Sequence, residues 1–162
     1  MIRPIARPVS TGQSGTDRAA LDFAIARGLA YGGCCPKGGW AEDFPDPPGL
    51  LARYPGLRET PDSDPRQRTE WNVRDSGGTL IFVQRGCASP GTAFTTAVAE
   101  RLSKPYSIVE LDEPDTAQRI CSWLEDNLAI RTLNIAGPRE SEAPGIYEGA
   151  SSVLGKLTGS DA

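Results

Sequence analysis

The chain has 162 residues, with 17 Lys and Arg, 21 Asp and Glu, four Cys and no His. The absence of His excludes Ser-His-Asp and Cys-His catalytic units and His-ligated zinc. A formal charge of -4 argues against a nucleic-acid backbone as the main partner, since that partner needs a basic face. An anionic small molecule held by a local group of Arg residues remains compatible with this composition. The length favours one domain over residues 1–162.

The sequence predicts neither a membrane span nor a secretory leader. The longest apolar runs have about five residues, whereas a span needs about 20, and the first eight residues contain no apolar signal core. The cysteines at 34, 35, 87 and 121 lack the C-x-x-C spacing of a zinc site. We therefore expect reduced thiols in a cytoplasmic protein, with a redox or metal role for Cys34 and Cys35 as the less favoured alternative.

The first third of the chain predicts a strand, a helix and a long loop. A short strand ends at Val9, and the helix that follows carries Leu21, Ala24, Ile25 and Gly28 on one buried stripe. Residues 31–65 are rich in Pro and Gly and predict a long ordered loop, with a short strand near 57–59. Such a loop is uncommon inside a compact domain and is often functional, although an oligomer contact or plain irregular packing would also explain it.

Helices and strands then alternate. We expect a polar helix over 64–74 and a strand over 79–83, whose continuous apolar run favours burial on both faces. A glycine turn at 89–92 leads into a helix that ends near Leu102, and a strand follows at 106–109.

The last part of the chain continues this pattern. Asp112 is placed to N-cap a helix, a strand follows at 130–136, and a final helix spans about 144–157. We expect residues 159–162 to be frayed. The apolar face of the helix after Asp112 carries Ile120, Trp123, Leu124 and Leu128.

This alternation predicts an α/β fold with a doubly wound, mostly parallel sheet in a Rossmann-like three-layer sandwich. Ligands bind such sheets at the carboxyl ends of the strands, at the topological switch point.

Two turns between a strand and a helix are rich in glycine and hydroxyl groups, and both are candidates for a phosphate site. Glycine lets the backbone approach a ligand, and the first N–H groups of a helix favour an anion. Neither turn is a complete G-x-G-x-x-G or P-loop motif. The candidate residues are Gly12, Gln13, Ser14, Gly15 and Thr16 in the first turn and Gly91, Thr92 and Thr95 in the second.

Charged residues near these turns are further candidates. Asp17 and Arg18 open the first helix, where Asp17 also suits the helix dipole without any function and Arg18 is a candidate ligand or interface group. Arginine binds phosphate bidentately, and five arginines lie between the long loop and the second helix, although a solvated helix face would explain any one of them. They are Arg53, Arg58, Arg66, Arg68 and Arg74.

Two more groups of polar residues lie where ligands bind such sheets. Arg68 and Asn72 are four residues apart and share a helical face with Asp75. The segment 137–142 follows the last strand, where either a site or a tight turn with capping acids would fit.

Several segments together resemble the molybdenum carrier family, the carriers of molybdenum cofactor. The resemblance runs in order over about 140 residues with its spacing kept. The segments that carry it are 10–22, 35–38, 41–43, Tyr54-Pro55, 57–60, 66–76, 78–81 and 134–141.

The resemblance implies a Rossmann-like fold related to the lysine-decarboxylase-like, or "lonely guy", phosphoribohydrolases. Those relatives bind a nucleoside monophosphate with an Arg ahead of the central strand and a P-G-G-x-G-T-x-x-E loop after it. Arg68 falls where that Arg is expected, but Thr95 replaces the catalytic Glu, which puts glycosidic hydrolysis in doubt. Thr11 replaces a Gly and Ser14 replaces a Thr of the S-G-G-Q-T-G turn that the carriers have, so a positive φ at Thr11 would be strained.

From this resemblance we expect a non-catalytic carrier that holds the phosphate of molybdopterin on both turns. Arg18, Arg68, Glu70, Asn72 and Lys37 would supply polar contacts, and the metal would stay on the cofactor's own sulfurs. A homo-oligomer and molybdoenzyme recipients are expected by the same analogy.

Two other functions stay open from the sequence. One is an enzyme acting on a nucleotide monophosphate, with Asp17, Glu70 or Asp75 as general acid or base. The other is a nucleotide sensor that acts through partner proteins.

Overall fold

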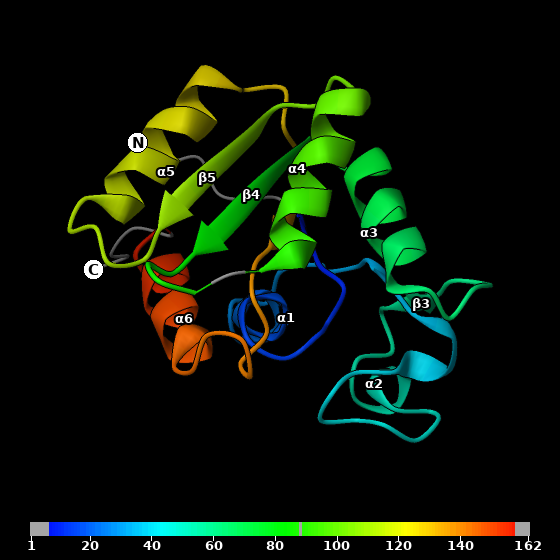
Figure 1. Ribbon diagram of the computed structural model, residues 1–162. Coiled ribbons are helices and arrows are strands. Elements are labelled where there is room, and N and C mark those ends of the chain that lie inside the picture. Colours follow the sequence, from blue (N-terminus) through cyan, green and yellow to red (C-terminus); the bar gives the residue numbers. More distant parts are fainter. Residues whose placement is uncertain (1–6, 88, 158–162) are drawn as a thin grey trace.

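A computed structural model describes residues 7–87 and 89–157 of the chain. Its centre is a parallel sheet of four strands in the order β1-β6-β4-β5, of which β4 and β5 are labelled in Figure 1. The fold is therefore the Rossmann-like α/β fold that the alternating pattern predicts. The strands are β1 (Arg7–Val9), β4 (Gly78–Val83), β5 (Tyr106–Glu110) and β6 (Thr132–Ala136).

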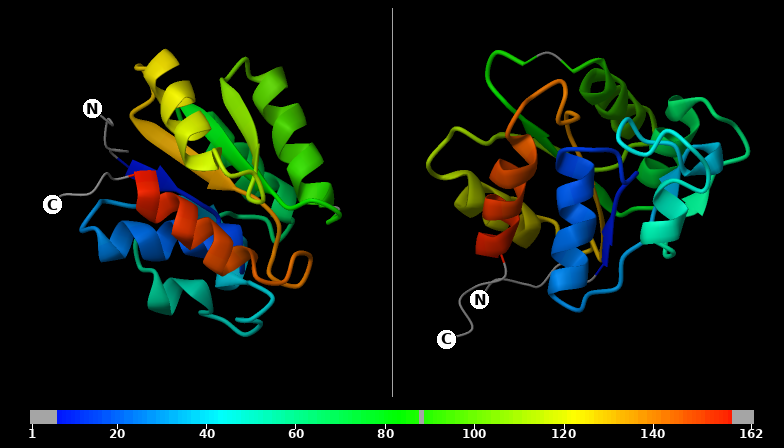
Figure 2. Two further views of the ribbon diagram at one scale, coloured as in Figure 1. Left: turned by 90° about the vertical axis from the view of Figure 1, so that its left-hand side faces the viewer. Right: turned by 90° about the horizontal axis from the view of Figure 1, so that it is seen from below.

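Helices cover the two faces of this sheet (Figure 2). One face carries α1 (Thr16–Ala26), α5 (Thr116–Asp126) and α6 (Ile146–Leu157), and the other carries α3 (Pro65–Arg74) and α4 (Pro90–Arg101). The three helices of the first face enclose the main apolar core together with Leu80 and Phe82 of β4 and Leu133 and Ile135 of β6. Strand β4 is buried along almost its whole length, which confirms that both of its faces are covered.

The strand order places the carboxyl ends of β1, β4 and β6 side by side. Val9–Asn134 is the last residue pair between β1 and β6, and Ile81–Ala136 is the last pair between β4 and β6. Between β1 and β4 the chain skips the position that β6 later fills. After β5 it turns back past β4 to form β6 between β1 and β4. These reversals create the switch point at which ligands bind such sheets.

The loop over 31–65 holds more regular structure than its composition predicts. A second, two-stranded parallel sheet pairs β2 (Cys34–Cys35) with β3 (Arg58–Glu59), and two short helices, Lys37–Gly39 and α2 (Leu50–Arg53), lie between them. Only the strand near 57–59 is anticipated by the sequence. An apolar cluster that includes Leu50 and Leu57 packs against Leu21 of α1 and anchors the loop.

Several details differ from the sequence prediction. Helix α5 begins at Thr116 after Asp115, so Asp112 lies in the preceding turn and does not cap it. The Thr116 hydroxyl donates to the carbonyl of Glu110 at 2.6 Å, which holds that turn together. Ile25 and Leu128 are 51% and 60% exposed, so they lie outside the buried stripes assigned to them. The tail over 159–162 lies outside the described residues.

Within the described ranges, no helix has the length and apolar character needed to cross a membrane.

Candidate functional site

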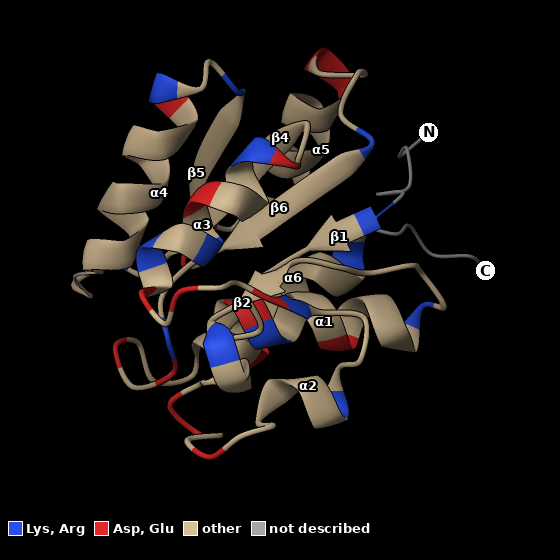
Figure 3. Cartoon of the chain, turned by 90° about the vertical axis from the view of Figure 1, so that its right-hand side faces the viewer, with Lys and Arg blue, Asp and Glu red and all other residues tan. Residues whose placement is uncertain are grey.

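A cavity of about 450 Å³ opens at the carboxyl ends of the strands, between α3, α4 and the turn that precedes α1. This volume is typical of sites for small molecules. Basic and acidic residues lie along α3 and in the loops around β2 (Figure 3). The cavity is lined by Thr11, Gln13, Asp17, Pro65, Arg66, Arg68, Thr69, Asn72, Ser89, Pro90, Gly91, Thr92, Phe94, Thr95, Asn134, Ala136, Gly137, Arg139 and Glu142.

Arg68 is the buried cation of this cavity. Asp64 is the N-cap of helix α3 and its carboxylate accepts from the Arg66 backbone N–H, and Pro65 occupies the first helical position. This start turns Arg68 inward, where it is 6% exposed and its Nε has no hydrogen-bond partner among the described residues. Burial lowers the pKa of the Arg68 guanidinium, while Asp17 acts in the opposite direction. A buried cation with an unused donor is costly unless a ligand supplies the acceptor.

Asp17, in the first turn of α1, is the buried acid of the same cavity. Its Oδ2 accepts from the Thr11 hydroxyl, and its Oδ1 has no partner among the described residues. Burial raises the pKa of Asp17 to about 6, against the charges of Arg68, Arg139 and Arg18 and the hydrogen bond from Thr11. No ion pair joins Asp17 to Arg68 in the described part of the chain, so the two opposite charges face the cavity separately.

The turn before α1 tolerates Thr11 without strain. The only residue other than Gly with positive φ in the described ranges is Ser103, so Thr11 needs no glycine-like conformation. Its hydroxyl instead donates to Asp17 and accepts from the Gln13 backbone N–H at 3.4 Å. The substitution of Gly by Thr at this position therefore adds a polar contact to the site.

Gln13 presents a fixed donor to the cavity. Its Oε1 accepts from the backbone N–H groups of Ser14 and Glu42 at 3.1 and 2.9 Å, which determines how the amide is oriented. The side chain is 3% exposed, and its Nε2 has no partner among the described residues.

The start of α4 forms the opposite wall. Ser89 is the N-cap but makes no capping hydrogen bond with its side chain, and the buried Thr92 hydroxyl has no partner among the described residues. The Thr95 hydroxyl donates to the Gly91 carbonyl at 2.8 Å within the helix. Helix α4 thus offers its positive end and the Thr92 hydroxyl to an anion.

The start of α1, in contrast, is covered by the chain itself. Gly15 has φ 79°, and a Cβ there would lie 2.5 Å from the Pro138 carbonyl oxygen. The Thr16 backbone N–H donates to the same carbonyl at 3.3 Å, and a Cβ on Gly12 would meet the apolar side chains of the Leu50 cluster. Of the five site residues predicted in this turn, the structure therefore brings Gln13 into the cavity, while Gly12, Ser14, Gly15 and Thr16 shape the turn.

Four charged candidates from the sequence also lie outside the cavity. Arg18 forms a bidentate ion pair with Asp43 at 2.8 Å, Glu70 pairs with Arg101, and Asp75 pairs with Arg74 at 2.8 Å. Lys37 is exposed on the short helix Lys37–Gly39 and does not line the cavity either.

Asn72 lines the cavity, but its amide is already used. It accepts from the Cys34 backbone N–H at 2.8 Å and donates to the Cys34 carbonyl at 3.2 Å. Asn72 therefore joins α3 to β2. The neighbouring Cys35 is fully buried, and burial raises the pKa of its thiol to about 11.

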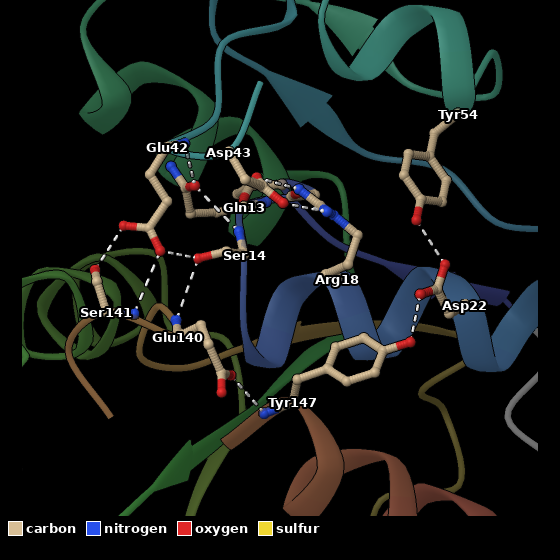
Figure 4. A network of polar contacts seen from close by, with 12 residues as sticks. Gln13, Ser14, Arg18, Asp22, Glu42, Asp43, Tyr54, Glu140, Ser141 and Tyr147 are labelled. Carbon is tan, nitrogen blue, oxygen red and sulfur yellow. Dashed lines mark hydrogen bonds and ion pairs between the residues drawn. The ribbon is translucent and has the colours of Figure 1, made fainter. Parts of the chain in front are cut away.

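A polar network holds the loops around the cavity in place (Figure 4). The Glu42 carboxylate accepts from the hydroxyls of Ser14 and Ser141, the second at 2.6 Å, so it joins the long loop to the loop after β6. Asp22 of α1 accepts from the hydroxyls of Tyr54 and Tyr147 at 2.6 and 2.5 Å.

The site also contains residues that were not among the sequence candidates. Arg139 and Glu142 come from the segment 137–142, which the sequence left open between a site and a turn. Asn134 is a buried polar residue inside an otherwise apolar strand, and that contrast is the signal by which it could have been found. Ser89 belongs to the second turn rich in glycine and hydroxyl groups, whereas Phe94 carries no comparable signal in the sequence.

No group of three or more Cys, Asp or Glu side chains in the described ranges is arranged to hold a metal ion.

Comparisons with known proteins agree with this fold. A family model described as "Circularly permutated YpsA SLOG family" matches residues 9–158. A crystal structure named "putative molybdenum carrier protein", from Syntrophus aciditrophicus SB, is 42% identical to this chain, with 94% of each chain covered and a TM-score of 0.84. A search of curated proteins found no match.

Proposed function

This chain belongs to the circularly permutated YpsA SLOG family, and from that premise we propose that it binds molybdenum cofactor through the phosphate of molybdopterin and carries it without catalysing a reaction. The similar structure is named a molybdenum carrier, and the cavity supports an anionic ligand. The observation that carries the proposal is Arg68, which is buried in the cavity wall with an unused donor. The phosphate would lie between Arg68, the Thr92 hydroxyl and the start of α4.

The composition of the wall fits a carrier better than a hydrolase. The cavity has donors for phosphate and for ring carbonyl groups, but Thr95 stands where the related hydrolases have a catalytic Glu. A carrier needs groups that bind its cargo, but it needs no catalytic group. We expect it to act in the cytoplasm, as a homo-oligomer, and to pass the cofactor to molybdoenzymes.

The first test identifies the ligand that the protein carries. Protein purified without oxygen should contain pterin and molybdenum in stoichiometric amounts, measured by mass spectrometry and metal analysis. Stoichiometric nucleotide with neither pterin nor molybdenum would contradict the carrier proposal.

The second test is Arg68→Ala. Loss of a hydrogen bond to a charged group costs about 1.5–3 kcal/mol, so we expect the dissociation constant for the cofactor to rise about 10- to 150-fold. Arg74→Ala is the matched control, because Arg74 lies on the same helix but pairs with Asp75 outside the cavity. Equal affinity in both variants would exclude Arg68 from phosphate binding.

One observation favours an enzyme that acts on a nucleotide instead. Asp17 lines the cavity, and its pKa of about 6 suits a general acid or base, whereas Glu70 and Asp75 lie outside. An enzyme should release base or phosphate slowly from a bound nucleotide, and Asp17→Asn should abolish that release while binding persists. Chromatography of the reaction products over hours measures it.

A further inference from the structure

The cavity wall contains four buried side-chain atoms without a partner among the described residues, and they differ in kind. Three of them can donate a hydrogen bond: Gln13 Nε2, Arg68 Nε and the Thr92 hydroxyl. The fourth, Oδ1 of the ionised Asp17 carboxylate, can accept a hydrogen bond but cannot donate one. The three donors suit phosphate or carbonyl oxygens. The acceptor needs an N–H or O–H group.

Phosphate alone cannot satisfy this set. Its oxygens match Arg68 and Thr92, but an anion placed against the Asp17 carboxylate would be repelled. A ligand that fills the cavity must therefore carry hydrogen-bond donors at some distance from its phosphate.

We propose that Asp17 recognises the ring of the ligand, by accepting hydrogen bonds from the adjacent N–H groups of a 2-amino-4-oxopyrimidine ring. Pterins and guanine share this ring. The inference rests on the proposed function, because it assumes that the cavity binds a phosphate-bearing ligand at Arg68.

The residues around the turn before α1 favour a ring edge, rather than a sugar hydroxyl, as the partner of Asp17. The Thr11 hydroxyl contacts both Asp17 Oδ2 and the Gln13 backbone N–H, so it ties the turn of Gln13 to the first turn of α1, and both Gln13 and Asp17 line the cavity. A 2-amino-4-oxo edge has N–H donors next to a carbonyl, so it gives Asp17 its donors and Gln13 Nε2 its acceptor. A sugar hydroxyl would match Asp17 but leave Gln13 Nε2 unpaired.

The first experiment needs only the wild-type protein. Isothermal titration calorimetry at pH 8 compares GMP with IMP, XMP and AMP, which differ at the ring edge, and with ribose 5-phosphate. We expect GMP to bind about 10- to 150-fold tighter than IMP or XMP, which is the effect of losing one hydrogen bond to a charged group. Equal affinity for the four nucleotides would overturn the inference.

The second experiment uses Asp17→Asn. Asparagine offers one acceptor and one donor in place of two acceptors, so it suits the N–H and carbonyl of xanthine. The preference should change from GMP to XMP, which a purely structural role of Asp17 would not produce. Asp46→Asn, at an exposed position away from the cavity, should keep the wild-type preference.

Two further results separate the remaining possibilities. If Asp17→Asn weakens all four nucleotides and ribose 5-phosphate equally, Asp17 contacts a sugar and the ring inference is wrong. If the wild type binds no phosphate compound at all, the proposed function fails as well.

A last pair of ligands shows whether the ring belongs to a pterin or to a guanine nucleotide. Pterin-6-carboxylate and lumazine-6-carboxylate differ only by the 2-amino group, which lumazine replaces with oxygen. Preference for the pterin over both lumazine and GMP indicates a pterin cargo, and preference for GMP over the pterin indicates a guanine nucleotide. Both results support recognition of the shared ring.

Discussion

Asp17 and Arg68 face the cavity from different helices, and each is more than nine-tenths buried. Removing charges from water is costly, and this cost is usually offset by a direct ion pair. Because no such pair is present among the described residues, the folded chain on its own bears part of this cost. A ligand that satisfies both groups would recover it.

Asp17 should make stability depend on pH. Its pKa rises from an ordinary value of 3.8 to about 6 on folding, so the folded state holds this proton more tightly than the unfolded state does. The proton on Asp17 therefore stabilises the folded state in full below pH 3.8, and this stabilisation is lost as the pH rises to about 6. A shift of this size corresponds to about 3 kcal/mol.

The measurement is urea unfolding of the wild type and of Asp17→Asn between pH 4 and 8. The unfolding free energy of the wild type relative to the variant should fall by about 2.5 kcal/mol over this interval. Asp46→Asn is the control for an exposed carboxylate. A constant difference between the wild type and Asp17→Asn would show that Asp17 keeps its ordinary pKa.

At the scale of residues, the sequence predicted some of the residues that line the cavity, but not which charged candidates would be engaged elsewhere. Arg68, Thr92 and Gln13 follow from motif spacing, and the structure brings all three to the cavity. Arg18 and Glu70 have equally suggestive positions, but partners remote in the chain, Asp43 and Arg101, engage them elsewhere. Such pairings depend on tertiary structure, and local spacing does not contain that information.

At the scale of elements, the contact between α1 and the loop after β6 determines the shape of the site. A Cβ on Gly15 would overlap the backbone of Pro138, Arg139 and Glu140. The loop that carries Arg139 and Glu142 into the cavity can therefore lie where it does only because residue 15 is glycine.

Gly15→Ala should be strongly destabilising. Positive φ and overlap with backbone atoms act together, and we expect the unfolding free energy to fall by about 3–5 kcal/mol. Gly28→Ala is the matched control, because Gly28 also has positive φ but a Cβ added there would meet no atom within 4 Å, so it should cost only about 1–2 kcal/mol. Urea unfolding midpoints compare the two. Similar losses would mean that the loop moves aside freely.

The long helices and buried strands were predicted closely, whereas most of the short elements inside the long loop were not. Apolar periodicity marks α1, which buries one face against the core, and a continuous apolar run marks β4, which is buried on both faces. Strand β2 consists of Cys34 and Cys35 alone and is fixed by Asn72, which lies 38 residues from Cys34. Short elements that depend on such distant contacts leave no periodic signal.

At the scale of the whole molecule, ligand binding should raise the thermal stability. A ligand at 100 times its dissociation constant contributes about 2.7 kcal/mol, which corresponds to about 5–10 °C in Tm for a chain of this size. Thermal unfolding with molybdopterin or GMP measures this shift, and Arg68→Ala should lose most of it. An equal shift in Arg68→Ala would indicate binding outside the cavity.

The pairing of β1 with β6 has a consequence for synthesis on the ribosome. Arg7 pairs with Thr132, about 125 residues later in the chain, whereas Thr79 of β4 pairs with Tyr106 of the next strand. As the polypeptide emerges, β4 and β5 can associate early, but β1 must wait until β6 has been translated, and such distant pairing also slows folding. Arg139 and Glu142 emerge later still. The cavity of a nascent chain is therefore incomplete until these last lining residues have emerged, and the proposed cargo could be bound only after that point.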